Sequence, residues 1–370
     1  MKIDRVELRE LQVSLRFRFE TSFGEEQHLR KLLLVVHSEE LEGYGEVTAG
    51  TAPGYSYETT ATSWTALVDY VLPSIVGREF ATPAQMLAAV SGVRGHNMAI
   101  GGLETAFWDL QAKAAGMPLW QLLGGVKTSI PVGASIGIQK SVEETVATAR
   151  RHADEGYRRL KFKIKPGWDV APLRAVREAL PTMPLTVDAN SAYALTDARV
   201  FHELDELGLD YIEQPLAHDD LVDHAKLQAG LTTALCLDES VHSAADARKG
   251  LELDAGRVIN LKVGRVRGHL ESRRVHDVAA SFGAPVWCGG MLELGVGRAH
   301  NLHLSTLENF SLPGDTASAT RYWGDDDIIE ERLDAVDGLQ ALPTSGPGLG
   351  VTLRYDLIDT LTVRAQAVGD

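Results

Sequence analysis

The spacing of apolar residues along the chain changes near residue 125. Before that point, residues 3–13 and 30–37 are predicted to form strands, and the triplet Gly43-Tyr44-Gly45 is predicted to turn the chain into a third strand. Apolar residues then recur at three- and four-residue steps, which predicts a helix at 101–114. Strands followed by helices favour an α+β unit that ends at Gly124-Gly125.

Beyond residue 130, short apolar segments alternate with helical ones. Helical spacing fills most of the gaps, as at 142–153, 171–180, 198–207 and 270–281. Repeated strand–helix units predict a parallel sheet, and eight units are the number that closes a (β/α)₈ barrel. An open doubly wound sheet is the alternative, but no G-x-G-x-x-G motif follows any of these strands. The predicted strands are 131–136, 159–165, 184–188, 209–213, 234–238, 257–262, 284–288 and 310–314.

Composition and charge narrow the class of protein. The 370 residues include 36 Lys and Arg against 51 Asp and Glu, and a net charge of −15 argues against sequence-independent nucleic-acid binding. No uncharged apolar stretch reaches the ~18 residues of a membrane span. The first five residues lack the apolar core of a signal peptide. Two cysteines, Cys236 and Cys288, are too few for a disulfide scaffold, so a reducing cytoplasm is expected.

Charged residues recur at the ends of successive predicted strands. The intervals between them are 25, 25, 25 and 24 residues, which matches one strand–helix unit. Because equivalent positions of successive units lie around one rim of a barrel, and active sites form at its C-terminal rim, these side chains are predicted to share one pocket. The five residues are Lys163, Asp188, Glu213, Asp238 and Lys262.

The alternation of side chains along the strands indicates which way these charges point. In Leu160-Lys161-Phe162-Lys163-Ile164 the lysines share one face and the apolar residues share the other. Leu185-Thr186-Val187-Asp188 repeats the pattern with an acid, as do the strands that end at Glu213, Asp238 and Lys262. Since the apolar faces must pack on the outer helices, the charges are predicted to point into the barrel mouth.

Three carboxylates that converge in a barrel mouth need a countercharge, because repulsion and desolvation would otherwise be severe. A divalent cation supplies it, and ligands that are all oxygen favour Mg²⁺ or Mn²⁺ over Zn²⁺. The alternative is that Asp188, Glu213 and Asp238 form ion pairs with Lys163 and Lys262. The acids and the lysines recur at the same position of successive strand–helix units, which favours the metal site.

The lysines suggest proton transfer. Lys161 and Lys163 point the same way, and two adjacent cations near a metal ion are expected to lower the lysine pKa toward the range of a general base. Lys262, on the sixth of eight strands, would face Lys163 across the mouth. The two could then reach opposite faces of a substrate α-carbon. The alternative is that 158–165 is a solvated basic strand. This is disfavoured because Lys163 lies at the same strand-end position as the acids of the following units.

These residues resemble the enolase superfamily, and specifically its muconate-lactonising branch, in which Lys-x-Lys precedes three strand-end acids and a further lysine. More closely, the chain resembles the o-succinylbenzoate synthase/N-succinylamino acid racemase family. The segments that carry this closer resemblance are Thr21-Ser22-Phe23-Gly24, Lys163-Ile164-Lys165-Pro166-Gly167-Trp168-Asp169, Val187-Asp188-Ala189-Asn190, Ile212-Glu213-Gln214-Pro215-Leu216, Leu237-Asp238-Glu239-Ser240, Pro285-Val286-Trp287-Cys288-Gly289-Gly290-Met291 and Leu312-Pro313-Gly314-Asp315-Thr316.

The resemblance implies an α/β fold in which an α+β capping domain covers a modified (β/α)₇β barrel. The cap would comprise residues 1–125 with the C-terminal tail 325–370, and the barrel would comprise 126–324. The Gly- and Pro-rich segment 338–350 leads into a last apolar stretch, 351–363, that is expected to pack back on the N-terminal unit.

The resemblance also implies roles for individual residues. Asp188, Glu213 and Asp238 would bind Mg²⁺, with Mn²⁺ or another divalent ion as alternatives. Lys163 and Lys262 would be the acid/base pair, and Lys161 would tune Lys163 and approach the substrate carboxylate. Arg265 matches an arginine that influences the second lysine in racemases, or else it is an exposed rim residue. The other expected substrate contacts are Ser135, Asn190, Gly290, Met291 and Phe23. The alternative for Ser135 and Asn190 is that they are only supporting hydrogen-bond partners.

The implied reaction is abstraction of a proton alpha to a carboxylate. The expected enzyme is an o-succinylbenzoate synthase, a lyase that dehydrates 2-succinyl-6-hydroxy-2,4-cyclohexadiene-1-carboxylate for menaquinone synthesis, with N-succinylamino acid racemase activity as well. A protein that is primarily the racemase is the first alternative. A muconate-type cycloisomerase or dipeptide epimerase is another, although the loop at 19–26 argues against it. A non-catalytic metal-binding barrel is disfavoured, because binding alone gives no reason for a lysine on each side.

Other features are expected to be structural. Cys288 is interpreted as a small packed residue, because no histidine has a predicted place beside it. The 12 histidines form no H-x-x-x-H pair, and His300 and His303 are expected in a packed helix. The expected partner is a small carboxylate substrate, and the chain is expected to form a homo-oligomer.

Overall fold

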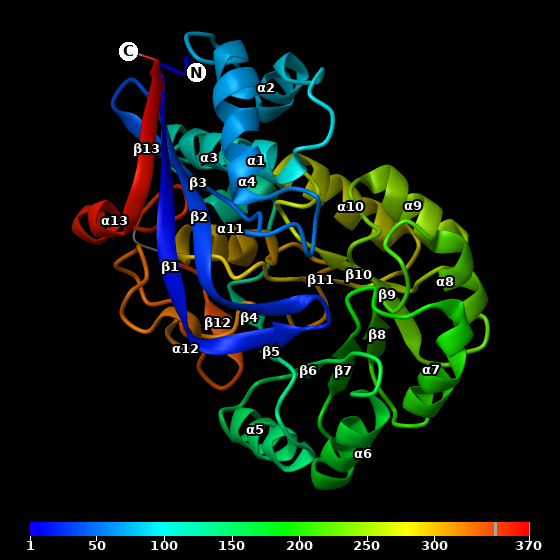
Figure 1. Ribbon diagram of the computed structural model, residues 1–370. Helices are drawn as coiled ribbons and strands as arrows, with labels where there is room; N and C mark the ends of the chain where they lie inside the picture. The colour runs from blue at the N-terminus through cyan, green and yellow to red at the C-terminus, as the bar shows by residue number, and fades with distance from the viewer. Residues whose placement is uncertain (344–345, 370) are drawn as a thin grey trace.

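The computed structural model describes residues 1–343 and 346–369. An antiparallel sheet with its own helices stands against a ring of parallel strands surrounded by helices (Figure 1). The green-to-yellow part of the chain forms the ring, and the blue and red parts lie together in the other sheet. This is the enolase-like arrangement of an N-terminal cap and a C-terminal barrel sheet that the sequence predicts.

The cap is built on a four-stranded sheet in the order β13-β1-β2-β3. Its first two strands extend well beyond the predicted 3–13 and 30–37, because alternating buried and exposed positions continue along β1 and allow a long hairpin. The apolar stretch at 351–363 becomes a helix and a strand, and the strand pairs with the start of β1. The elements are β1 (Arg5–Thr21), β2 (Gly24–Ser38), β3 (Leu41–Val47), α13 (Tyr355–Leu361) and β13 (Thr362–Gly369).

The predicted turn at Gly43-Tyr44-Gly45 is wrong, since this triplet lies inside β3. Its glycines are needed for a close contact instead, because α3 (Asn97–Ala114) crosses the strand there. A Cβ on Gly43 would lie 2.1 Å from the carbonyl oxygen of Ala106, and one on Gly45 would lie 2.0 Å from that of Gly102. Glycine therefore lets backbone touch backbone between the sheet and the helix.

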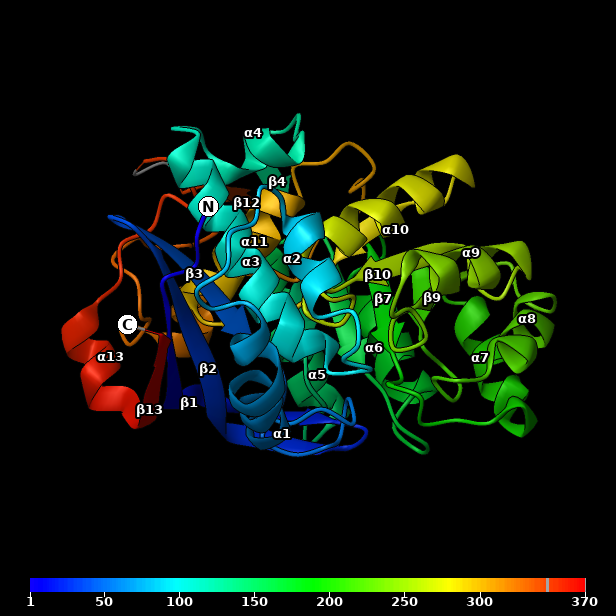
Figure 2. The same ribbon diagram turned by 90° about the horizontal axis from the view of Figure 1, so that it is seen from above.

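Helices cover one side of the cap sheet, as the view from above shows (Figure 2). The predicted helix at 101–114 is confirmed as the C-terminal part of α3, which is buried along most of its length. Shorter helical segments fill the rest of the cap core. They are α1 (Thr60–Thr65), η1 (Ala66–Val71), η2 (Leu72–Ser74) and α2 (Pro83–Ala89). The short helix α4 (Leu119–Leu123) packs instead in the cluster that joins the cap to the barrel.

The barrel sheet has seven parallel strands in sequence order. Register pairs Lys163 with Asp188, and Asp188 with Glu213, so the charged strand ends lie side by side. The strands are β5 (Ala134–Ile136), β6 (Leu160–Lys163), β7 (Leu185–Asp188), β8 (Tyr211–Glu213), β9 (Ala234–Leu237), β10 (Val258–Leu261) and β11 (Val286–Cys288).

The predicted strand at 310–314 is wrong as a regular strand. Pro313 has no N–H to donate to a β-ladder. The segment therefore occupies the place of the eighth barrel strand with only isolated backbone hydrogen bonds to its neighbours. Asp315 N donates to Cys288 O at 2.9 Å on one side, and Gly133 N donates to Gly314 O at 2.8 Å on the other. The predicted strand at 131–136 is likewise divided, and its first part, β4 (Ser129–Pro131), pairs with β12 (Leu339–Ala341).

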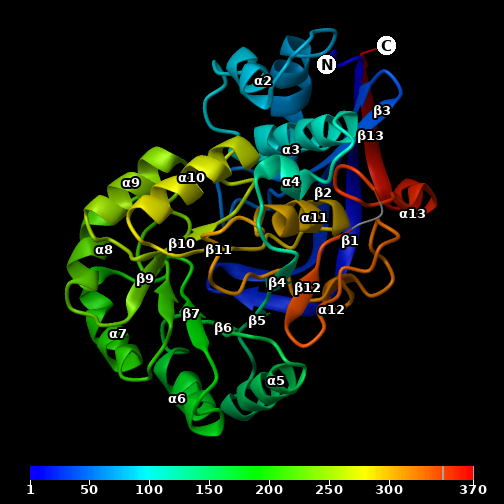
Figure 3. The ribbon, with the colours of Figure 1, turned by 180° about the vertical axis from the view of Figure 1, so that it is seen from behind.

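Helices lie outside the barrel strands, as the view from behind shows (Figure 3). The four helices predicted in this part are confirmed within a few residues. None of the helices in the described ranges has the length and apolar character of a membrane span. The helices are α5 (Val142–Asp154), α6 (Val170–Ala179), η3 (Leu195–Asp197), α7 (Ala198–Asp205), α8 (Leu221–Gln228), α9 (Ala244–Glu252), α10 (His269–Ser281), α11 (Gly295–Leu304) and α12 (Ala319–Trp323).

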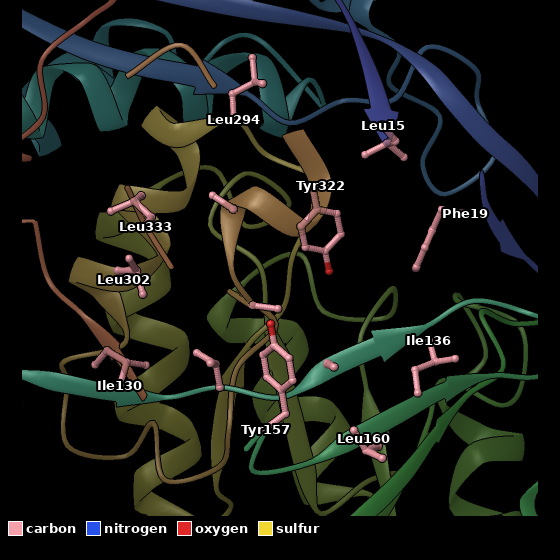
Figure 4. Close-up of a cluster of buried hydrophobic side chains, with 14 of the residues drawn as sticks. Leu15, Phe19, Ile130, Ile136, Tyr157, Leu160, Leu294, Leu302, Tyr322 and Leu333 are labelled. Carbon is pink, nitrogen blue, oxygen red and sulfur yellow. The ribbon is translucent and has the colours of Figure 1, made fainter. Parts of the chain in front are cut away.

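One apolar cluster joins the two parts. Leu15 and Phe19 come from β1, Tyr322 comes from α12, and Ile136 and Leu160 come from the barrel strands (Figure 4). All five are buried. Because β1 runs directly over the mouth of the barrel, the cap is held in place by the same core that supports the strand ends.

Candidate active site

The predicted charged residues lie at the C-terminal ends of five successive strands. Lys163, Asp188 and Glu213 are the last residues of β6, β7 and β8, and Asp238 and Lys262 directly follow β9 and β10. All but Lys163 are buried, and its side chain is only 9% exposed. The structure therefore brings the five side chains to one rim. Three strands separate the two lysines.

Lys161 lies at the centre of this cluster. Its Nζ is 2.7 Å from Asp315 Oδ2, 3.1 Å from Glu213 Oε2 and 3.4 Å from Asp188 Oδ2. It also lies 4.6 Å from the centroid of the Trp287 ring. Three carboxylates and an aromatic ring thus fix this ammonium deep in the mouth.

Lys163 is held by the neighbouring strand. Its Nζ donates to Asp188 Oδ2 at 2.6 Å and to Asn190 Oδ1 at 2.7 Å. Asn190 has a φ of 44° and donates from Nδ2 to Glu239 at 2.9 Å. Asn190 therefore lies where a substrate contact was expected, and it also orients Lys163.

Lys262 is held by a different set of residues. Its Nζ donates to Asp238 Oδ2 at 2.9 Å, and the ring of Tyr55 lies over it at 4.1 Å. Arg265 forms an ion pair with Asp238 Oδ1 and donates to Val241 O at 2.7 Å. Since Arg265 is buried, the expectation of an exposed rim arginine is wrong. Arg265 lies behind Asp238, and it does not line the cavity that Lys163 and Lys262 border.

The rim charges change one another's proton affinity. Burial lowers the pKa of Lys161, but the three carboxylates around it outweigh burial and raise the pKa above the ordinary value. Tyr55 and the nearby carboxylates likewise outweigh burial and raise the pKa of Lys262. Carboxylates lie closer to the ammonium of Lys161 than other cations do. The expected lowering of a lysine pKa assumed a metal ion beside the two lysines, so it stays a prediction.

The acids respond to burial and to the lysines. Burial alone would raise the pKa of Asp188, but Lys163 and Lys161 lower it to about 2. Burial and the charge of Asp188 raise the pKa of Glu213. Burial, with a contribution from Asp188, raises the pKa of Glu239 to about 7. Asp188, Glu213 and Glu239 thus repel one another at close range in the mouth, which is a condition that a nearby cation relieves.

The donor set fits a hard divalent cation in its chemistry. Asp188, Glu213 and Asp238 offer only oxygen, and within the described residues the one charged group paired with the buried Glu213 Oε2 is Lys161, at 3.1 Å. Within residues 1–343 and 346–369, however, no three His, Cys, Asp or Glu side chains converge as a formed metal site. Asp188 and Glu213 contact Lys161, and Asp238 contacts Lys262. Glu213 also accepts a hydrogen bond from the side-chain amide of Asn260. The metal-binding role of the three acids stays a prediction.

The lysines border a small cavity beneath the cap. Its inner part, about 60 Å³, is lined by Ser135, Gly290 and the lysines, and its outer part, about 80 Å³, is lined by Met291 and Phe23. Ser135 Oγ is buried and has no hydrogen-bond partner. A larger cavity of about 910 Å³ lies outside the barrel beside α5, and no strand-end lysine or acid lines it.

Four residues at this site carry no predicted role. Asp315, Glu239 and Trp287 lie within segments that carry the family resemblance, so these motifs are a signal that leads to them. Trp287 lies beneath Lys161 on β11. Tyr55 lies on an irregular loop of the cap, and no periodic pattern leads from the sequence to its place beside Lys262. His300, His303 and Cys288 are buried structural residues, as expected.

Comparison with known proteins shows the family of this chain. The family description "Mandelate racemase / muconate lactonizing enzyme, N-terminal domain" matches residues 4–124, and "Enolase C-terminal domain-like" matches 144–357. The chain is similar to an N-succinylamino acid racemase of Thermus thermophilus, with 54% identity over 98% of both chains. It is also similar to an o-succinylbenzoate synthase of Geobacillus kaustophilus, with 50% identity over 99% of this chain and 97% of the relative.

A solved structure supports the same assignment. A member of the enolase superfamily from Listeria innocua superposes with a TM-score of 0.95 at 35% identity, covering 100% of this chain and 99% of that one. Enzymes of this superfamily generally use a divalent metal ion. The chain therefore belongs to the enolase superfamily, and its full-length relatives include enzymes named as o-succinylbenzoate synthases and N-succinylamino acid racemases.

Proposed function

We propose that this chain is an o-succinylbenzoate synthase that also racemises N-succinylamino acids. The observation that carries the proposal is the placement of Lys163 and Lys262, which border one cavity from strands separated by three others. Both named reactions begin with removal of a proton alpha to a carboxylate, so one pair of lysines can serve both. The identity to relatives of each name, 54% and 50%, supports the pairing.

Asp188, Glu213 and Asp238 are proposed to hold Mg²⁺, with Mn²⁺ as an alternative. When bound, such an ion would neutralise the substrate carboxylate and stabilise the negative charge that develops as the α-proton leaves. Lys161, fixed among carboxylates, would lie beside the substrate carboxylate as a second positive charge. This assignment rests on the oxygen-only donors and on the mutual repulsion of the buried acids described above.

The lysines would move the proton. In synthase mode, neutral Lys163 takes the α-proton at Nζ and returns it to the departing hydroxyl, which leaves as water. Lys262 then stays protonated on the other side of the cavity and stabilises negative charge. In racemase mode, one lysine takes the α-proton and the other delivers a proton to the opposite face. Positioned proton transfer of this kind contributes roughly 10²–10⁴-fold to a rate.

A protein that is primarily the racemase is the second candidate. The 54% identity to the Thermus racemase favours it, as does the contact of Arg265 with Asp238, the acid that holds Lys262. The menaquinone pathway, a cytoplasmic location, a homo-oligomer and division of the chain at 125/126 and 324/325 are also parts of the proposal. A cycloisomerase, a dipeptide epimerase or a non-catalytic barrel has no separate observation in its favour.

Parallel assays test the function. The purified chain with Mg²⁺ is incubated with the cyclohexadiene substrate, and o-succinylbenzoate is measured by its aromatic absorbance. The same enzyme is incubated with N-succinyl-L-amino acids, and the D-enantiomer is measured by chiral chromatography. Turnover of both substrates is expected. A folded, metal-loaded enzyme that converts neither would overturn the proposal, and one that converts only the second would make it a racemase.

A further inference from the structure

Tyr55 places a cap side chain against the lysine on the far side of the cavity. It lies on the loop between β3 and α1, and its hydroxyl donates to Asp238 Oδ1 at 2.9 Å. Arg265 donates to the same hydroxyl at 3.0 Å. Lys262 Nζ lies 4.1 Å from the centroid of the Tyr55 ring and donates to the other oxygen of Asp238. Tyr55 thus contacts the lysine directly and also holds its carboxylate partner.

The other lysine is held without help from the cap. Lys163 Nζ has two hydrogen-bond acceptors, Asp188 and Asn190, and both come from the barrel. Among the residues that the structure describes, Lys262 Nζ has one, Asp238. A lysine side chain has four flexible bonds, so a single acceptor leaves the ammonium more freedom than two do. The aromatic face supplies the missing constraint, since ammonium groups are attracted to it.

We propose that Tyr55 is the positioning residue of Lys262. The ring fixes the ammonium from the cap side while the hydroxyl fixes Asp238, so that Lys262 meets its face of the substrate α-carbon. This inference rests on the proposed function, in which each lysine serves one face. Tyr55 is not expected to affect proton transfer at the face of the substrate α-carbon that Lys163 serves.

The position of Tyr55 also links lysine placement to the cover of the cavity. The Phe23 ring packs directly on Gly54, the residue before Tyr55, where a Cβ would lie 2.8 Å from the ring. Both loops line the outer cavity. Phe23, at the hairpin turn that would cover the substrate, and Tyr55, whose ring holds Lys262, therefore belong to one packed unit of the cap.

Isotope exchange measures the two faces separately. Each enantiomer of an N-succinylamino acid is incubated with Mg²⁺-loaded enzyme in ²H₂O, and the loss of the α-proton is followed by NMR. The enantiomer that depends on Lys262 is identified as the one whose exchange is lost in Lys262→Ala. Tyr55→Leu is expected to slow exchange of that enantiomer on the order of tenfold relative to the other. Tyr55→Phe, which keeps the ring, should restore the ratio to within about threefold of wild type.

The matched control is Tyr57→Leu, on the same loop, because Tyr57 is 61% exposed and lies outside the cluster. It is expected to leave both exchange rates unchanged. Equal slowing of both enantiomers by Tyr55→Leu would show a merely structural role and overturn the inference. An unchanged ratio would overturn it as well.

A second measurement needs no turnover. Amidination of the metal-free enzyme by methyl acetimidate, mapped by mass spectrometry, reports how accessible each lysine is. Lys262 should react several-fold faster in Tyr55→Leu than in wild type or Tyr55→Phe, while Lys163 should not change. If wild-type enzyme exchanges neither enantiomer, the racemase part of the proposed function fails, and the amidination ratio still decides the role of Tyr55. Equal Lys262 reactivity in all three proteins would refute it.

Discussion

At the barrel rim, Lys163, Asp188 and Glu213 lie in register on adjacent strands. Two cap residues border the cavity beside this rim, Tyr55 from an irregular loop and Phe23 from the turn of the β1–β2 hairpin. The rim residues contact one another through ion pairs and short hydrogen bonds. The cap residues contribute aromatic surface and one hydroxyl. The barrel therefore carries the charge of the site, and the cap covers it and constrains one lysine.

This division teaches where each kind of change should be felt. Rim substitutions remove groups that take part in proton transfer or charge balance, so their effects should appear in turnover. Cap substitutions alter enclosure and placement, so their effects should appear in substrate affinity or in the balance between faces. The predictions below test this contrast, beginning with the largest effect.

The largest effect is expected at the barrel rim. Lys163→Ala removes the proposed base and should lower turnover of both substrates by on the order of 10³-fold. Steady-state assays with each substrate provide the measurement. The control is Lys165→Ala, because Lys165 is 41% exposed and pairs with Glu20. Turnover within tenfold of wild type in Lys163→Ala would exclude this lysine as the base.

The second largest effect is expected from removal of the divalent metal ion. Exhaustive chelation is expected to abolish both activities, and added Mg²⁺ or Mn²⁺ should restore them. Glu213→Gln removes a buried carboxylate charge and should weaken metal binding at least tenfold, which titration calorimetry measures. The comparison variant is Glu203→Gln on α7, where the side chain is 41% exposed. Full activity after chelation would remove the metal from the proposal.

A pH-dependent effect is expected where cap and barrel meet. Glu46, on β3, accepts from Leu294 N at 3.0 Å and Gly297 N at 2.9 Å, and burial raises its pKa to about 8. A carboxyl whose pKa is higher in the folded state favours folding when protonated. Stability should therefore fall as pH rises from the ordinary value near 4.5 through about 8, by on the order of a few kcal/mol.

Glu46→Gln should remove most of that pH slope, whatever its effect on stability at pH 5. Urea unfolding at a series of pH values gives the slope, and Glu40→Gln, at an exposed position, is the control. A slope that persists in Glu46→Gln would assign the pH dependence to other groups.

The smallest effect is expected at the cap loop. Phe23 is 41% exposed and lines the outer cavity. Phe23→Ala should raise KM roughly three- to tenfold with little change in kcat, because only part of the ring area is available to cover a substrate. Tyr70→Ala, at a 64% exposed cap position outside the cavity lining, should change neither constant. A large fall in kcat would instead place Phe23 within the chemistry.

The contrast also explains what could be predicted from sequence. A regular interval of about 25 residues and the alternation of strand faces lead directly to Lys163, Asp188 and Glu213, because repeated units repeat their geometry. Tyr55 has no such period, since the loop that carries it follows neither helix nor strand spacing. Gly43 was misread for a related reason, because a glycine required by a crossing helix looks the same in sequence as one required by a turn.

The segment that crosses the eighth barrel position has a consequence for how the protein folds. It delivers Asp315 to Lys161 through backbone bonds between Gly314 and Gly133, which lie far apart along the chain. Contacts of such long sequence separation carry a large loop-closure cost and form slowly. The pocket around Lys161 is therefore expected to be assembled late, after the strands on both sides of the opening are already in place.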